Sequence, residues 1–190
     1  MQKIFFTSDL HFNHKNIIKY CNRPYENIED MNLDIIKRWN NVVSKEDIVW
    51  CLGDVAFGNK THAIELVKSL NGRKRLIMGN HDHWKISVYL EMGFEIVSPC
   101  PIIWGGKYIL SHVPYPNLPE GYINIYGHIH NHEVFDNFCQ NAACVCIERF
   151  NYAPVRFEAI ADGILQAQSK PKLQDYINNP DAAEILKVEP

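Results

Sequence analysis

The sequence lacks several features that would point to membranes, long nucleic acids or disulfide-rich folds. Its formal net charge of −3 provides no surplus of positive charge for bulk attraction to nucleic acid or anionic lipid. No apolar run approaches the roughly 20 residues that a membrane span requires. The six cysteines show no paired CxxC spacing, which favours buried reduced thiols over a zinc knuckle or a disulfide framework. The amino terminus also lacks the pattern of a secretory signal, so we expect a cytoplasmic protein without membrane contact.

The chain length of 190 residues suits one domain with one core. We find no internal repeats, low-complexity tracts or charge runs. Residues 166–190 are largely polar and show no obvious partner face. We therefore expect a single domain over residues 1–165 and a peripheral tail over residues 166–190.

The two halves of this domain differ in rhythm. In the first half, the apolar runs "KIFFTS", "DIVWCLG" and "KRLIMG" alternate with helical patterns over residues 28–39 and 61–70. This alternation predicts a parallel sheet with crossover helices, the second helix capped by Thr61 and stopped by Asn71-Gly72. From about residue 94, short strands dominate: "FEIVSP", "KYILSH", "YINIYGH" and "ACVCIERF", with a hairpin turn at "WGGK" and a later helix at "FEAIADGILQAQ".

Polar side chains of metal-binding type follow five of these strands. Because ligands collect at the carboxyl ends of strands in open α/β sheets, these side chains are expected to converge on one rim. Two ions explain their number better than one, and imidazole and oxygen donors without thiolate suit Mn, Fe or Zn. The residues in question are Asp9, His11, Asp54, Asn80, His81, His112, His128 and His130.

Each short motif has a simpler explanation when taken alone. "GD" is commonly a turn, "SDLH" is a common pair after a strand, and "GHIH" fits a polar edge strand. "GNHD" is more informative, because glycine permits a sharp turn while asparagine and histidine present their side chains together. All five motifs in order, each ending a strand, are difficult to explain by turn chemistry.

The ordered set Asp9-x-His11, Gly53-Asp54, Gly79-Asn80-His81-Asp82, Ser111-His112 and Gly127-His128-x-His130 resembles the calcineurin-like metallophosphoesterase superfamily. The stretch "HFNHKNIIKYCNRPYENIEDMN" further resembles a group of small bacterial and phage-borne members. The resemblance implies an α/β fold with a β-sandwich flanked by helices in α/β/β/α layers. It also implies one metal held by Asp9, His11, Asp54 and His130, and a second held by Asp54, Asn80, His112 and His128, with Asp54 bridging.

The same resemblance implies roles for the neighbouring residues. His81 is expected to act as the general acid that protonates the leaving oxygen. Asp82 either orients His81 or is an ordinary turn or cap aspartate. In the loop after the first strand, His14, Asn16 and Arg23 are candidates for substrate contact, because such rims carry specificity.

The expected function is dinuclear, metal-dependent hydrolysis of a phosphoester by a metal-bridging hydroxide. A small nucleotide or other small phosphodiester is favoured as the substrate, since no arginine immediately flanks the core motifs to meet the second charge of a monoester. Two alternatives remain: a binding module that keeps the fold without catalysis, and a nuclease. The acidic balance weighs against long nucleic acid as a partner. The native metals and the oligomeric state are left open.

Overall fold

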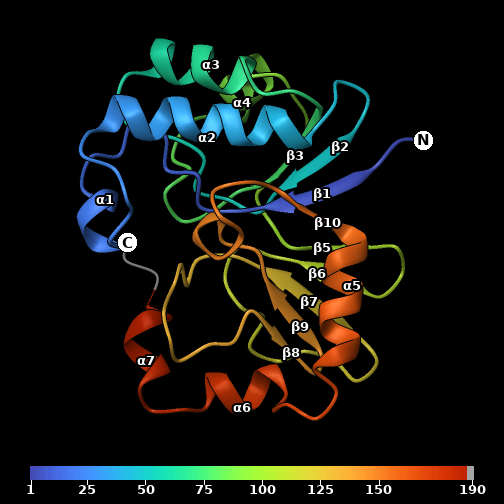
Figure 1. The fold of residues 1–190 in the computed structure, drawn as a ribbon. Coiled ribbons are helices and arrows are strands. Elements are labelled where there is room, and N and C mark those ends of the chain that lie inside the picture. Colours follow the sequence, from blue (N-terminus) through green and yellow to red (C-terminus); the bar gives the residue numbers. More distant parts are fainter. Residues whose placement is uncertain (188–190) are drawn as a thin grey trace.

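Two five-stranded sheets form the centre of the computed structural model, which describes residues 1–187 (Figure 1). The first sheet has the order β10-β1-β2-β3-β4, and its strands are parallel except for β10, which runs antiparallel to β1. Three of the predicted apolar runs become its central strands. The bounds are β1 (Ile4–Thr7), β2 (Ile48–Cys51), β3 (Arg73–Ile77), β4 (Phe94–Ser98) and β10 (Val155–Arg156).

The second sheet has the order β5-β6-β7-β9-β8 and mixes parallel with antiparallel pairs. The hairpin predicted at "WGGK" is confirmed, because Trp104 of β5 pairs with Tyr108 of β6 across that turn. Strands β6, β7 and β9 are parallel neighbours, so their carboxyl ends lie at one edge. The bounds are β5 (Ile102–Trp104), β6 (Tyr108–Leu110), β7 (Ile123–Tyr126), β8 (Phe138–Cys139) and β9 (Ala142–Cys144).

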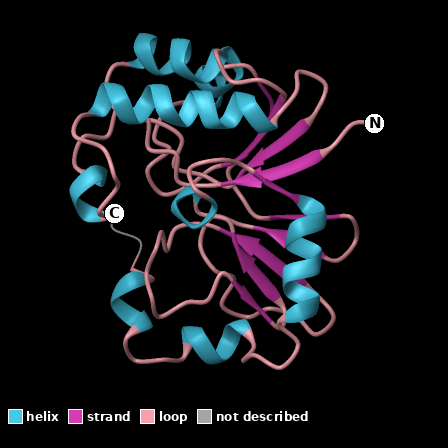
Figure 2. Cartoon of the chain, in the orientation of Figure 1, coloured by secondary structure: helices cyan, strands magenta, loops and turns pink. Residues whose placement is uncertain are grey.

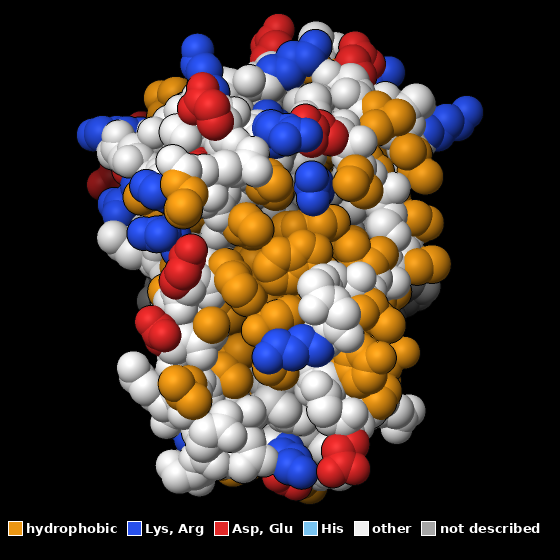
Figure 3. Space-filling view, turned by 90° about the vertical axis from the view of Figure 1, so that its right-hand side faces the viewer, with side chains coloured by type: hydrophobic (Ala, Val, Ile, Leu, Met, Phe, Trp, Pro, Cys, Tyr) orange, Lys and Arg blue, Asp and Glu red, His pale blue; other side chains and the backbone are white. Residues whose placement is uncertain are grey.

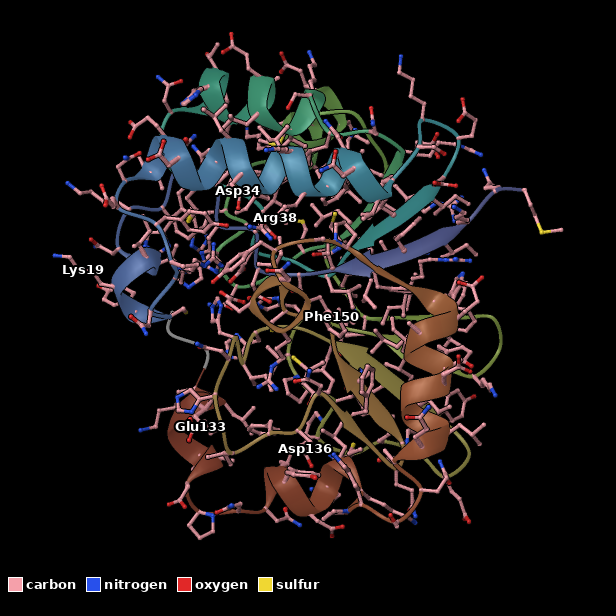
Figure 4. All side chains as sticks on the ribbon, viewed as in Figure 1. Lys19, Asp34, Arg38, Glu133, Asp136 and Phe150 are labelled. Carbon is pink, nitrogen blue, oxygen red and sulfur yellow. The ribbon has the colours of Figure 1, made fainter. Side chains whose placement is uncertain are left out.

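Helices cover the first sheet on its outer face, where α2, α3 and α4 pack (Figure 1). Both helices predicted in the first half are present, although Asn59 rather than Thr61 caps the second, since its side chain accepts the backbone N–H of His62. On α2, Asp34 and Arg38 form an ion pair of 2.5 Å one helical turn apart (Figure 4). The bounds are α1 (Ile17–Tyr20), α2 (Ile28–Val42), α3 (Lys60–Lys68) and α4 (Ile86–Glu91).

The sheets face each other across a shared apolar layer, as the two stacked groups of strands in Figure 2 show. Phe6, Trp50 and Ile77 of the first sheet pack there with Leu110 and Ile125 of the second. A second apolar cluster fills the space between the first sheet and helices α2 to α4. Helix α5 (Phe157–Gln166) borders the sandwich, and α6 (Leu173–Ile177) and α7 (Ala182–Ile185) pack near the second sheet. The predicted sandwich flanked by helices is therefore confirmed.

Two segments differ from expectation. The run "ACVCIERF" does not form one strand, because only its start belongs to β9 and the 3-10 helix η1 (Ile147–Phe150) follows it. In the carboxyl-terminal segment, which was expected to have no partner face, Leu173 and Ala182 are fully buried against the second sheet. The last residues of that predicted tail, 188–190, lie outside the described residues. The division between residues 165 and 166 stays a prediction.

The two ends of the parallel strands differ in chemistry. At the amino ends, partly buried apolar residues such as Ile4, Ile48 and Tyr108 close the sandwich, and Figure 3 shows hydrophobic side chains gathered on that side of the molecule. The opposite, carboxyl ends carry the polar motifs. None of the helices within residues 1–187 combines the length and apolar character that crossing a bilayer demands.

Candidate metal centre

The carboxyl ends of strands from both sheets bring all seven predicted metal ligands into one place. Asp9 and His11 follow β1, Asp54 follows β2, and Asn80 follows β3. From the second sheet, one histidine follows β6 and two follow β7. Left-handed backbone conformations, which are rare for residues other than glycine, are found at Asp9 (φ 61°), His11 (52°), Asp54 (57°), His128 (73°) and His130 (46°). Such concentrated strain is typical of sites whose side-chain directions matter for function.

One group of ligand atoms gathers around the Asp9 carboxylate. His130 Nε2 lies 3.7 Å and His11 Nε2 lies 3.8 Å from Asp9 Oδ1. Atoms bound at about 2.0–2.1 Å to one ion are separated from each other by about 3–4 Å, so these spacings suit shared coordination. The arrangement agrees with three of the four ligands predicted for the first ion.

A second group surrounds Asn80. Its Oδ1 atom lies 2.9 Å from His112 Nε2 and 3.1 Å from His128 Nδ1, and these two imidazole nitrogens are 3.3 Å apart. His112 is fixed from behind, because its Nδ1 hydrogen-bonds the backbone carbonyl of Leu52 at 2.7 Å. That bond leaves Nε2 to face the site.

Asp54 lies between the two groups. Its Oδ2 atom is 3.5 Å from His11 Nε2 and 3.4 Å from His112 Nε2, so one oxygen faces a predicted ligand of each ion. Its other oxygen, Oδ1, accepts the backbone N–H of His81 at 3.0 Å. The Asp54 carboxylate is therefore placed where a bridging ligand is needed.

Unpartnered polar atoms give an independent test of whether these residues fit metal ions. Asp9 Oδ1, His11 Nε2 and His128 Nε2 are buried without a hydrogen-bond partner among the described residues. Since an unpaired buried polar atom costs free energy, such atoms call for an unseen partner. A divalent cation beside Asp9 would satisfy Asp9 Oδ1 and His11 Nε2, because each atom carries a lone pair when its carboxylate or imidazole is deprotonated. His128 Nε2 is the ring nitrogen opposite the one that faces Asn80. These residues therefore fit divalent metal ions.

The electrostatics also suit cations. Burial raises the pKa of Asp54, but nearby His112 outweighs it and lowers that pKa to about 2. Burial lowers the pKa of His11 to about 4, which keeps that imidazole neutral and available as a ligand. Burial also lowers the pKa of His112, yet the charge and hydrogen bond of Asp54 together with the charge of Asp9 overcome it and raise the value to about 9. The negative charge of the aspartates thus favours positive charge in the site, here in the form of a proton on His112.

Glycine at position 53 permits the close approach of three motif segments. Its φ of +96° favours glycine, and a Cβ atom there would lie 2.5 Å from His112 Nδ1 and 2.6 Å from Gly79 Cα. Any side chain at this position would push apart the loops that carry Asp54, Asn80 and His112.

His81 lies beside the ligands without joining them. Its ring centre is 5.7 Å from that of His11, it is half-buried, and its side chain borders a pocket of about 550 Å³. No side-chain hydrogen bond fixes the ring within the described residues. His81 can therefore present a ring nitrogen to a molecule in the pocket, as a general acid requires.

Among the described residues, the Asp82 carboxylate forms no hydrogen bond with the His81 side chain and instead holds the neighbouring loops. Its buried carboxylate accepts the backbone N–H groups of Asp54 (2.8 Å), Val55 (3.1 Å) and Gly79 (2.8 Å). Burial and the charge of Asp54 raise its pKa to about 6, against the effect of these bonds. This geometry speaks against the role as orienter of His81 and favours the simpler alternative, an aspartate that holds turns in place.

The three predicted substrate residues occupy different settings. His14 lines the pocket, with its ring stacked on Phe57 at 4.2 Å and its Nδ1 3.1 Å from His11 Nδ1. Asn16 is exposed at the start of α1, where its side chain caps nothing. Arg23 is buried, and its guanidinium donates to Glu148 and to backbone carbonyls, which speaks against direct contact with substrate.

Two residues of this region escaped sequence reasoning. Phe57 borders the pocket between His11, His14 and His81, and Glu148 hydrogen-bonds His130 at 2.9 Å. Phe57 follows the "GD" motif closely, which was a usable signal. Glu148 lies in a segment that was predicted to be a strand, and no local sequence pattern marks it as part of the site.

The comparisons with known proteins agree with this geometry. The model of the calcineurin-like phosphoesterase family matches residues 2–158. The chain belongs to this family.

Among its relatives, an uncharacterized protein of Methanocaldococcus jannaschii is 42% identical over 171 residues, covering 84% of this chain and 90% of the relative. The Gene 66 protein of Mycobacterium phage L5 is 31% identical over 164 residues, covering 69% of this chain and 79% of the relative. A crystal structure of a protein of unknown function from Aquifex aeolicus aligns with a TM-score of 0.64 and 25% identity, covering 85% of this chain and 99% of that one.

Proposed function

We propose that this metallophosphoesterase hydrolyses a small phosphodiester, such as a small nucleotide, with two divalent ions bound in its centre. The observation that supports this most strongly is the position of Asp54, whose Oδ2 atom lies 3.4–3.5 Å from one predicted histidine ligand of each ion. A binuclear site of this kind clamps phosphoryl oxygens and makes a water nucleophilic near neutral pH, which is the chemistry that Mn, Fe or Zn ions would supply.

The residues of the chain divide the work. Asp9, His11 and His130 would hold the first ion, Asn80, His112 and His128 the second, and Asp54 both. His81 then delivers a proton to the leaving oxygen from the pocket side, since its ring borders both the ligands and the open volume. Asp82 and Gly53 hold the ligand loops at their spacing.

The preference for diesters is supported by the lack of free cationic side chains around the centre. The two pockets that adjoin the ligands contain no Lys or Arg among their described lining residues. Two nearby arginines are engaged elsewhere: Arg23 with Glu148, and Arg149 with the backbone carbonyls of His130, His132 and Phe135. A monoester carries a second negative charge that such cations would normally meet.

The test compares two chromogenic substrates on one enzyme. The protein is stripped with a chelator, reloaded with Mn²⁺, and assayed with bis-p-nitrophenyl phosphate and p-nitrophenyl phosphate. We expect kcat/KM to be higher for the diester and to vanish when the ions are removed. Asp9→Asn, purified in the same way, controls for contaminating phosphatases.

The outcomes separate the alternatives. Stoichiometric metal binding without turnover of any phosphoester would favour a binding module. Higher activity on single-stranded oligonucleotides than on cyclic or dinucleotide substrates, with a steep fall in salt, would favour a nuclease. A higher kcat/KM for the monoester would overturn the proposed diester preference while leaving the phosphoesterase activity intact.

A further inference from the structure

A buried carboxylate lies directly behind one of the predicted ligands. Glu148, on η1, places Oε1 2.9 Å from Nδ1 of His130. The opposite ring nitrogen, Nε2, points to Asp9 Oδ1 at 3.7 Å. A carboxylate that holds one nitrogen of an imidazole fixes both the ring orientation and the tautomer, so the other nitrogen keeps its lone pair for a metal.

Glu148 is itself held by Arg23. The guanidinium donates from Nε (3.0 Å) and Nη2 (2.6 Å) to the same Oε1 atom, and both side chains are almost fully buried, at 0% and 3% exposed. A buried ion pair with several hydrogen bonds has little freedom to move, because breaking it leaves an uncompensated charge. The carboxylate therefore cannot turn away from His130 at low cost.

The same guanidinium reaches the other side of the centre. Its Nη2 donates to the backbone carbonyl of Asp9 at 2.7 Å, and its Nη1 donates to that of Leu10 at 2.9 Å. Arg23 thus connects the loop after β1, which carries Asp9 and His11, to the residue that orients His130. Two of the four ligands predicted for the first ion are linked through one side chain: Asp9 by its backbone carbonyl, and His130 by way of Glu148.

We propose that Arg23 and Glu148 form a positioning pair that sets the affinity of the first metal site through His130 and Asp9. The proposal concerns metal binding and rests on the proposed function only in that the centre binds two ions. Neither residue is a ligand or touches the substrate. Their effect should be largest at the site that contains His130, since no hydrogen bond or ion pair of the described residues joins either side chain directly to Asn80, His112 or His128; the second group is reached only through Asp9, whose Oδ2 accepts the backbone N–H of His128.

A separate metal site at Cys21, His130 and Glu148 is the competing interpretation, because ligand atoms of these three residues also lie close together. Arg23 argues against it: the guanidinium already occupies the oxygen that faces His130, and its charge would repel a cation there. The second oxygen, Oε2, is buried without a partner among the described residues, so this alternative needs a direct test.

The experiment measures Mn²⁺ binding to the chelator-treated protein by isothermal titration calorimetry. Wild type is expected to bind two equivalents. Glu148→Gln and Glu148→Ala should weaken one equivalent by about 10–100-fold, the usual effect of losing a partner behind a metal ligand, and leave the other unchanged. Arg23→Lys, which keeps the charge but loses the planar fork, should weaken the same equivalent by a smaller factor. Glu158→Gln, a change at an exposed carboxylate, is the matched control and should bind as wild type does.

Circular dichroism and thermal unfolding of each metal-free variant show whether it is folded. If Glu148→Ala does not fold, the titration of Glu148→Gln is used to test the proposal. Equal weakening of both equivalents, or wild-type affinity in a folded Glu148 variant, would overturn the proposal. So would a third equivalent in wild type that is lost in Glu148→Ala, because Glu148 would then be a ligand. A wild type that binds no Mn²⁺ overturns it too. If wild type binds two ions but hydrolyses no phosphoester, the proposed function fails while the titration still tests this pair.

Discussion

The carboxylate of Asp82 accepts the backbone N–H of Asp54 at 2.8 Å, so the residue after the histidine of "GNHD" holds the loop that carries Asp54, the predicted bridging ligand. The same carboxylate also holds Val55 and Gly79. Two loops that carry predicted metal ligands, one after β2 and one after β3, are joined in this way. Asp82 acts on the centre through backbone geometry.

Asp82→Ala should therefore destabilise the protein as well as weaken the centre. Three buried N–H groups would lose their acceptor, and each unpaired group costs about 1–3 kcal/mol, less whatever water recovers. We expect the free energy of unfolding in urea to fall by at least one such amount. Mn²⁺ affinity should fall too, as the loop of Asp54 loosens. A variant as stable as wild type, with only turnover reduced, would instead favour a role beside His81.

His81→Ala should lower turnover of a diester by roughly 10²–10⁴, the usual contribution of a general acid, because the leaving oxygen would depart without its proton. Mn²⁺ binding should be unchanged, since His81 approaches the ligands only through its backbone N–H and ring edge. His62→Ala, on the exposed face of α3, is the matched histidine control. Wild-type turnover in the His81 variant would remove it from the mechanism.

The convergence of the predicted ligands could be foreseen from the sequence because each of them follows an apolar strand, and strand order places carboxyl ends together. The extent to which each side chain is buried could not be predicted in this way. Arg23 sits in a polar loop and was expected at the rim, yet its guanidinium is buried and turned inward to Glu148. That contact spans 125 residues of sequence, and nothing local to either residue predicts it.

The prediction of secondary structure was wrong where the local sequence pattern and tertiary packing disagree. "ACVCIERF" has the composition of a strand, but its second half turns into η1, whose backbone ends in a left-handed conformation at Asn151. The helix η1 carries Glu148, whose Oε1 lies 2.9 Å from Nδ1 of His130. The carboxyl-terminal segment is polar overall, yet Leu173 and Ala182 are buried against the second sheet, and Tyr176 and Ile177 pack beside them. Single anchor residues of this kind have no periodicity to detect.

Asp54→Asn should weaken the binding of both metal ions together, because one neutral amide oxygen would replace the carboxylate that faces both groups of predicted ligands. Calorimetry with Mn²⁺ should show both equivalents shifted to lower affinity, in contrast to the single equivalent expected for Glu148 variants. Asp162→Asn, at an exposed position on α5, is the control. Retention of one equivalent at wild-type affinity would argue that Asp54 serves one ion alone.

The contacts of Asp47 lead to a prediction about stability at acid pH that does not depend on the metal centre. Its buried carboxylate accepts the backbone N–H groups of Lys3 (2.8 Å) and Ser44 (2.9 Å) and the Ser44 hydroxyl (2.8 Å), which joins the start of β1 to the turn before β2. Burial raises the pKa of Asp47, but these hydrogen bonds outweigh it and leave the pKa below its usual value. The folded protein therefore favours the ionised form.

A lowered pKa in the folded state means that the unfolded chain binds the proton more readily. The contribution of Asp47 is then fully present above the unfolded pKa of about 3.9, and it is lost as the pH falls through the lower pKa of the folded protein. Asp47→Asn should reduce the free energy of unfolding by about 1–3 kcal/mol at pH 6, as expected for hydrogen bonds to a charged group. The gap between variant and wild type should close toward pH 2. Urea unfolding of chelator-treated protein across this range measures it, and a gap that stays constant would assign the loss to packing instead of charge.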